Sequence, residues 1–374
     1  MRNLPINLIF YCFPLISIVA RFANRGQLNY DFFWAPAFVV VLFLLIGTKF
    51  KKKYFVLFTW LSLLLFLKYV LPLFFYGNVQ LYPWLMDCKW VVYLLFSIFW
   101  INRFGLPSGR VIYKGSLFFS KVYILYAIYI IIRGQLSREG ILMESNYDGF
   151  MILMGFCLID KYKQSKIDWL YFVFATLLTF SRTGLVAMIL MLFYRTVRRN
   201  ILYLVPLVPI FIGIVLLVVY FRGHESIENF DRFVFYNQAF VYFSETSIWN
   251  VLFGSTPGVS LKMSVDGVFQ WYIDVFENLR NLRGIYPFYF HSTYLRLALT
   301  WGIFGFLAYS FFFIYKFLSS KILSRRYFCL LILVQSISLS VLTLQNVSVL
   351  FFMMLIMLIA EEKKYKMLLI KRTH

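Results

Sequence analysis

His291-Ser-Thr-Tyr-Leu-Arg-Leu-Ala-Leu-Thr-Trp-Gly-Ile-Phe-Gly305 begins with one of only three histidines and continues directly into an apolar segment. At 100° per residue, Ala298, Gly302 and Gly305 lie within about 40° of the helix line through His291. Small residues allow a neighbouring backbone to approach closely in a bilayer. The spacing therefore predicts one tightly packed membrane helix that holds an imidazole at its wet end.

The composition of the whole chain predicts an all-α, polytopic membrane protein. Its 374 residues are 61% hydrophobic and 22% aromatic, whereas soluble domains carry more charge and fewer long apolar runs. The formal net charge of +21 would suit a nucleic-acid-binding protein, but the basic residues lie in short loops between apolar segments. That placement follows the positive-inside rule, so membrane lipids are expected partners and nucleic acid is not.

Apolar segments near the length of a bilayer crossing predict about twelve transmembrane helices. Three parts follow: nine crossings in 1–221, a large outer loop with its own helices in 222–290, and three crossings with a basic tail in 291–374. The segments are 5–21, 32–49, 54–75, 84–102, 116–132, 147–160, 167–181, 184–195, 201–221, 291–316, 326–343 and 345–361.

Lysine and arginine are concentrated in alternate loops and in the C-terminal tail, which predicts that both termini are cytoplasmic. The 222–290 loop and His291 then lie on the outer face. Within this loop, five aromatic residues recur at helical spacing in 226–243 and predict a helix on the membrane interface. A second amphipathic helix is expected at 268–283. The aromatic residues are Phe230, Phe233, Tyr236, Phe240 and Phe243.

Several polar residues on the outer side are candidates for chemistry. Arg182 lies in a short turn between apolar segments, so it is expected to face a water-filled cavity or an anion. His291 is either a general base near neutral pH or an interfacial histidine bonded to water. Arg280 and Arg283 lie among carboxylates and either bind an anion or form salt bridges. Asn146 either caps a helix or belongs to a site.

Neither a metal nor a cofactor is expected from the residue pattern. Cysteines and carboxylates lack ligand spacing, and no phosphate-binding loop or nucleotide fingerprint is present in the sequence. Near the outer ends of their segments, Lys68, Asp87 and Lys89 are expected either to snorkel or to form an ion pair between Asp87 and one of the lysines.

Four short motifs, taken in order, resemble those of a family. They are Glu144-Ser-Asn-Tyr147, Ser181-Arg-Thr-Gly184, Asp231-Arg-Phe-Val-Phe-Tyr-Asn-Gln238 and His291-Ser-x9-Gly302-x-x-Gly305. In this order, with a long outer loop before the histidine, they resemble the O-antigen ligase and O-antigen polymerase superfamily of bacterial inner-membrane glycosyltransferases. The resemblance covers about residues 140–315 and rests mainly on the histidine motif.

The resemblance implies a GT-C-like architecture and a glycan donor linked to undecaprenyl diphosphate, used at the periplasmic face without metal or cofactor. It implies that His291 activates the acceptor hydroxyl and that Arg182 and Arg232 hold the diphosphate. Arg138 and Gly149 also match an Arg-x10-Gly pattern of some polymerases. The remaining substrate-binding candidates are Asn146, Arg138, Arg280, Arg283 and Tyr294.

Two enzymes remain open within this family. A polymerase extends a lipid-linked glycan by one repeat unit, alongside a chain-length regulator and a flippase as possible partners, and a ligase transfers the finished glycan to lipid A-core. The compact size and the lack of an added soluble domain favour the polymerase. A non-enzymatic flippase is a more distant alternative, because a transporter should place charged residues along a pathway through its helices.

Overall fold

The fold is built from helices, as the composition predicts. The computed structural model describes residues 1–23, 28–44, 51–134, 140–142, 144–198, 209, 213, 231–265, 269–270, 273–274, 282 and 284–373. No strand occurs among these residues, and an isolated antiparallel bridge joins Leu261 and Ile285. The all-α prediction is therefore confirmed for the described part of the chain.

Six helical segments in the described part are long and apolar enough to cross a membrane. The first two are composite: α1 (Leu4–Asn7), η1 (Leu8–Cys12) and α2 (Phe13–Phe22), then α4 (Lys52–Leu65), η2 (Phe66–Val70) and α5 (Leu71–Phe75). The others are α6 (Leu81–Phe104), α7 (Gly109–Ile132), α16 (Thr293–Ser319) and the Gln345–Tyr365 part of α18 (Gln345–Thr373).

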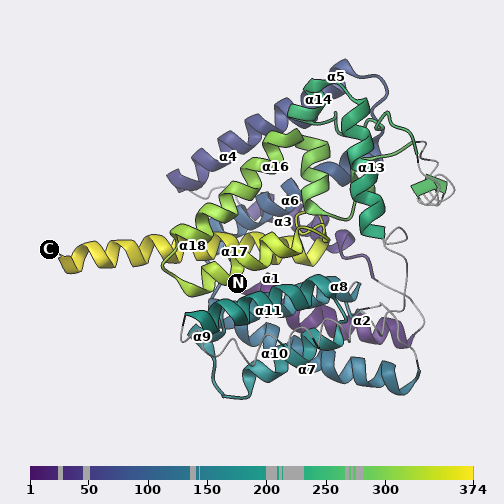
Figure 1. Ribbon diagram of the computed structural model, residues 1–374. Coiled ribbons are helices and arrows are strands. Elements are labelled where there is room, and N and C mark those ends of the chain that lie inside the picture. Colours follow the sequence, from purple (N-terminus) through teal and green to yellow (C-terminus); the bar gives the residue numbers. More distant parts are fainter. Residues whose placement is uncertain are drawn as a thin grey trace.

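Shorter helices complete the arrangement in Figure 1. In the apolar body they are α3 (Asp31–Leu44), α8 (Ser145–Phe156), α9 (Ile159–Tyr162), α10 (Asp168–Leu178), α11 (Arg182–Val197) and α17 (Leu323–Gln335). In the segment before α16 they are α13 (Asp231–Glu245), α14 (Ile248–Phe253) and η5 (Pro287–Tyr289).

Helices occupy eleven of the twelve predicted crossings, and the remaining one, 201–221, lies outside the described residues apart from two positions. The helix predicted at 268–283 also lies mostly outside them. The count of about twelve crossings, and the outer location of the 222–290 loop, therefore remain predictions. The short helices are the reason, because several of them are below the length that a full crossing needs.

Helix α8 lies at the centre of the body. All of its residues except Asn146 are buried, and it packs against α7, α10, α11, α17 and α18. A helix that is apolar on every side is stable only when other helices surround it. This position explains why α8 has no lipid-facing stripe, and it fixes the start of the helix relative to the starts of its neighbours.

A second apolar cluster lies under α13. Val234, Phe235 and Tyr242 of this helix are buried against Ile285 and the start of α16. The aromatic stripe that predicted the helix lies on a different face, where the side chains of Phe233 and Phe240 are 51% and 73% exposed. The helix was therefore predicted correctly, and the location of its aromatic stripe at the membrane interface remains a prediction. The aromatic stripe is left available for the membrane interface.

Helix α16 is broken at Gly302, so the prediction of one straight small-residue stripe was wrong. Gly302 has a φ of +67°, and a side chain there would overlap the backbone of Leu252 at the end of α14. Gly254 has a φ of +80°, and a side chain there would overlap the backbone of Thr300. Both glycines combine the left-handed conformation with close backbone approach, which other residues resist. The two glycines therefore allow α14 to pack against the kink in α16.

Helix α17 ends at Gln335, earlier than the predicted crossing at 326–343. Residues 336–344 form a non-helical connector before α18, which we call the 336–344 connector. Serine and threonine recur in it, and their side chains compete with helical backbone hydrogen bonding. Most of its residues are buried, so its backbone groups need partners from other elements.

We expect Gly302→Ala to destabilise the protein by about 2 kcal/mol or more, because it adds a Cβ to a left-handed position in backbone contact. Thermal unfolding of the purified protein in detergent measures this as a lowered Tm. Gly77→Ala is the matched control, since a Cβ at Gly77 meets nothing within 4 Å. Equal Tm values for the two variants would contradict the role given to Gly302.

Candidate functional site

His291 lies just before α16, between η5 and the helix start. It is half-buried, and its ring contacts the edge of Phe235 from α13, with ring centroids 5.5 Å apart. The Ser292 hydroxyl accepts a hydrogen bond from the backbone N–H of Leu295 and so caps α16. The histidine is therefore presented on an extended backbone next to a capped helix, not from within the helix.

The 336–344 connector holds this histidine segment in place. The Ser292 hydroxyl donates to the carbonyl of Ser336 over 2.9 Å. Both the backbone N–H and the hydroxyl of Thr293 donate to the carbonyl of Leu339, over 2.9 and 2.6 Å. The backbone N–H of Val341 donates in turn to the Thr293 hydroxyl over 2.9 Å. These bonds fix the two residues that follow His291 against the connector.

The Arg182 segment reaches the same connector from α11. Ser181 caps this helix by accepting a hydrogen bond from the backbone N–H of Gly184 over 3.1 Å, and Arg182 is its first residue. The Thr183 hydroxyl lies 2.8 Å from that of Ser338. Half-buried Arg182 is therefore placed at a helix start, next to the connector that also binds the residues after His291. Helix starts favour anions because their free N–H groups and dipole are positive.

Helix α13 reaches the connector through Tyr236. Its hydroxyl donates to the carbonyl of Ile337 over 2.9 Å and lies 3.3 Å from the Ser292 hydroxyl. Arg232 precedes Tyr236 by four residues in the same helix. The side chain of Arg232 itself lies outside the described part of the structure.

Helix α8 supplies the fourth contact. The backbone N–H of Ser340 donates to the Tyr147 hydroxyl over 3.3 Å, and Asn146 is the neighbouring residue. The Asn146 side chain donates to Glu144 over 2.9 Å, so it braces the helix start and does not act as its N-cap residue, which is Glu144. The segments of all four motifs therefore meet at one connector, although they are far apart in the sequence.

Of the other predicted site residues, Tyr294 contacts the connector through its backbone N–H, which donates to the carbonyl of Ser336 over 3.3 Å. The Tyr294 hydroxyl donates to the carbonyl of Leu333 in α17 over 2.9 Å, and its ring lies against Tyr309. Its hydroxyl is therefore directed into the helix packing. Arg138, Arg280 and Arg283 lie outside the described residues.

A group of ion pairs lies at the opposite end of the same helices. Helices α8, α11 and α16 all begin beside the connector, and the ion pairs lie beyond their other ends or between neighbouring elements there. These pairs are Arg195–Asp160, Lys161–Glu361 and Arg325–Glu362. The body thus has a connector end, with the predicted site, and a basic end.

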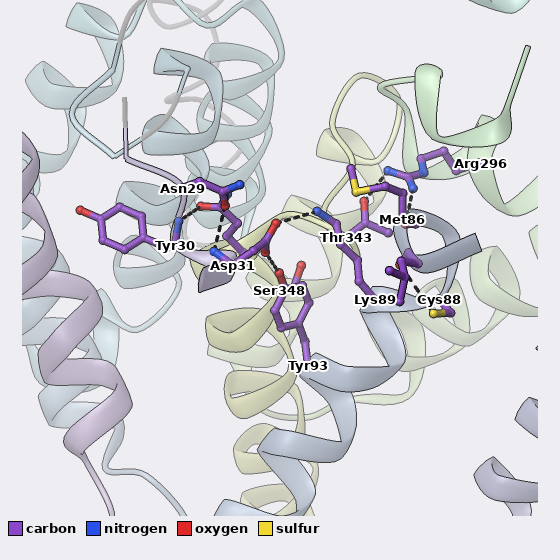
Figure 2. A network of polar contacts seen from close by, with 12 residues as sticks. Asn29, Tyr30, Asp31, Met86, Cys88, Lys89, Tyr93, Arg296, Thr343 and Ser348 are labelled. Atoms are coloured by element: carbon purple, nitrogen blue, oxygen red, sulfur yellow. Dashed lines mark hydrogen bonds and ion pairs between the residues drawn. The ribbon is translucent and has the colours of Figure 1, made fainter. Parts of the chain in front are cut away.

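Sequence reasoning missed a buried ion pair below the histidine segment. Arg296 of α16 donates to the Thr343 hydroxyl over 2.6 Å and to the carbonyl of Met86 over 3.0 Å, as Figure 2 shows. It lies 3.8 Å from the carboxylate of Asp87. A charged residue five positions into a predicted crossing was the available signal, since such residues rarely lack a function.

The expected pairing of Asp87 with Lys68 or Lys89 was wrong. Lys89 pairs with Asp31 over 3.3 Å (Figure 2). Lys68 donates to the carbonyls of Phe253 and Ser255, over 3.1 and 3.0 Å. A cation bonded to carbonyls after a helix end stabilises the negative end of its dipole. Lys68 therefore fastens α14 to the body.

In the segment after α13, hydrogen bonds from Ser264 lower the pKa of the Glu245 carboxyl. Among the described residues, no three His, Cys, Asp or Glu side chains group as a metal site requires.

No protein-family model, curated protein or solved structure matches the chain.

We expect Thr183→Cys and Ser338→Cys to form a disulfide in a background where the four native cysteines are replaced, because their hydroxyl oxygens are 2.8 Å apart. Mild oxidation of membranes followed by mass spectrometry of linked peptides measures this. Thr183→Cys with Ser320→Cys is the control, since Ser320 follows the far end of α16. Equal linking of both pairs would contradict the arrangement.

Proposed function

We propose that this protein is an O-antigen or capsular polysaccharide polymerase of the bacterial inner membrane. It transfers a glycan from undecaprenyl diphosphate to the next lipid-linked repeat unit. The observation that carries the proposal is the meeting of the four motif segments at the 336–344 connector. A chance resemblance in four short motifs gives no reason for their segments to share one set of hydrogen bonds.

The donor diphosphate is assigned to Arg182 and Arg232. A guanidinium binds phosphate oxygens through two parallel hydrogen bonds, and the start of α11 adds partial positive charge beside Arg182. As the glycosidic bond breaks, negative charge develops on the diphosphate. Preorganised positive groups stabilise that charge in the transition state, where it contributes to the rate.

The acceptor hydroxyl is assigned to His291. Neutral imidazole takes the proton of the hydroxyl group as its oxygen bonds to the anomeric carbon of the donor, while the bond from that carbon to the diphosphate oxygen breaks. Undecaprenyl diphosphate leaves with the electron pair. The contact with Phe235 and the capped start of α16 limit the motion of the ring, which general-base catalysis requires.

The connector end is assigned to the periplasmic face, and both termini to the cytoplasm. The ends of α8, α11 and α16 that lie away from the connector are followed by lysine and arginine, which remain on the cytoplasmic side of inner-membrane proteins. A lipid-linked donor that has been carried across the membrane then meets the site on the side where the polymer is assembled.

A ligase is the second candidate, because the histidine motif and its placement would serve a lipid A-core acceptor equally well. Deleting the gene and separating the lipopolysaccharide on a gel distinguishes the functions. We expect core that carries a single repeat unit, because a lost polymerase still leaves units for ligation. Bare core with accumulated lipid-linked polymer would establish the ligase instead. Repeat units trapped on the cytoplasmic face would establish a flippase.

We expect His291→Ala to lower the transfer rate by at least about a hundredfold, since a general base contributes that much or more. Arg182→Lys keeps the charge but loses the paired hydrogen bonds, and is expected to lower the rate at least about tenfold. Polymer formed by membranes from a purified lipid-linked donor measures both rates. Arg195→Lys at the basic end is the matched control, and near-normal rates in all three variants would reject the assigned roles.

A further inference from the structure

Beneath the histidine segment, α6, α16 and the connector line a small pocket with both polar and apolar walls. Its walls include Asp87 and Trp90 of α6, Thr293, Arg296 and Thr300 of α16, and Thr343 of the connector. About 300 Å³ within it is not filled by atoms when the open solvent at its mouth is counted, so the enclosed part is smaller than this. Thr293 follows His291 by two residues, so the pocket adjoins the proposed reaction site.

Asp87 is the unusual group in this pocket. Its side chain is fully buried, and neither carboxylate oxygen has a hydrogen bond of normal geometry. Arg296 at 3.8 Å and the backbone at Gly258 are polar neighbours. Buried carboxylate oxygens almost always accept hydrogen bonds, because an unsatisfied one costs free energy. The two carboxylate oxygens of Asp87 therefore indicate that the pocket receives a ligand with hydrogen-bond donors.

The hydroxyl groups of the pocket define what kind of donor fits. The Thr293 hydroxyl donates to the carbonyl of Leu339, and that of Thr300 donates to the carbonyl of Arg296. Since each has already donated its hydrogen, toward the pocket they only accept, as does Asp87. These oxygens fit a ligand with O–H or N–H donors, and the guanidinium of Arg296 in the same wall is a donor. Hydroxyl groups, which both donate and accept, meet both requirements.

The charges around the pocket determine which hydrogen-bond donors of a ligand fit it. Arg296 offsets the charge of Asp87, and Lys68 adds a further positive charge nearby. A cationic ligand would be repelled by these groups, whereas neutral hydroxyl groups would not. Trp90 forms part of the wall, and its indole N–H already donates to the Tyr69 hydroxyl over 3.1 Å, so it offers the ligand an apolar surface.

We infer that this pocket is a subsite for a sugar of the acceptor glycan, whose adjacent hydroxyl groups donate to the two oxygens of Asp87. The pocket takes the hydroxyl-bearing edge of one ring, and the rest of the glycan extends toward His291. This inference rests on the proposed function for its substrate class. It assigns the acceptor to the α6–α16 side of the connector, while Arg182 holds the donor on the α11 side.

The test is binding of the free repeat-unit oligosaccharide, released by mild acid from the lipid-linked donor of the same cells, to the protein in lipid nanodiscs. Asp87→Asn is expected to weaken binding about tenfold or more, since bonds to a charged acceptor are lost. Asp31→Asn is the matched control, because Asp31 is paired with Lys89 outside the pocket. If Asp87→Asn fails to fold, Thr300→Val decides, with a severalfold loss expected.

Two further results separate this inference from the proposed function. His291→Ala should lower transfer at least about a hundredfold, while it weakens binding of the oligosaccharide less than Asp87→Asn does. Binding that depends on Asp87 in a protein without transferase activity would reject the polymerase and keep the subsite. Wild-type protein that does not bind the oligosaccharide at millimolar concentration, or binding that is equal in wild type, Asp87→Asn and Thr300→Val, would overturn the subsite.

Discussion

The hydrogen bonding of the buried 336–344 connector is the constraint on which the rest of this structure depends. Non-helical backbone inside an apolar body is tolerated only when other elements satisfy its N–H and C=O groups. Here the partners of its backbone groups include Tyr147 at the start of α8, Thr293 at the start of α16 and Tyr236 on α13. Thr183 at the start of α11 adds a contact between its hydroxyl and that of Ser338 in the connector. The contacts that hold the connector therefore also bring the motif segments together.

Much of the helical framework follows from apolar length alone, because a segment without charges must be surrounded by lipid or by other helices. Packing details do not follow from it. Residues 336–344 are apolar enough to be counted with the crossing before them, and only their recurring serine and threonine indicate otherwise. Gly302 was assigned to a smooth helix because spacing contains no information on a left-handed φ, which here depends on contact with α14.

For the candidate site, sequence order was informative where a motif and a helix start coincide, as at Ser181 and Ser292, both of which cap helices beside the connector. It was uninformative for Arg296 and Asp87, which come together from α16 and α6 across most of the chain. Their pairing depends on tertiary packing. Lys68 and Lys89 were plausible partners by distance along the sequence, yet α14 and α3 bind them instead.

The central claim is that one connector unites a donor side and an acceptor side around His291. A structure of the protein in nanodiscs with a bound lipid-linked oligosaccharide tests it most directly. The account predicts the diphosphate at the start of α11, beside Arg182, with the first sugar facing His291. A diphosphate bound at the basic end, or on a lipid-facing surface away from the connector, would contradict it.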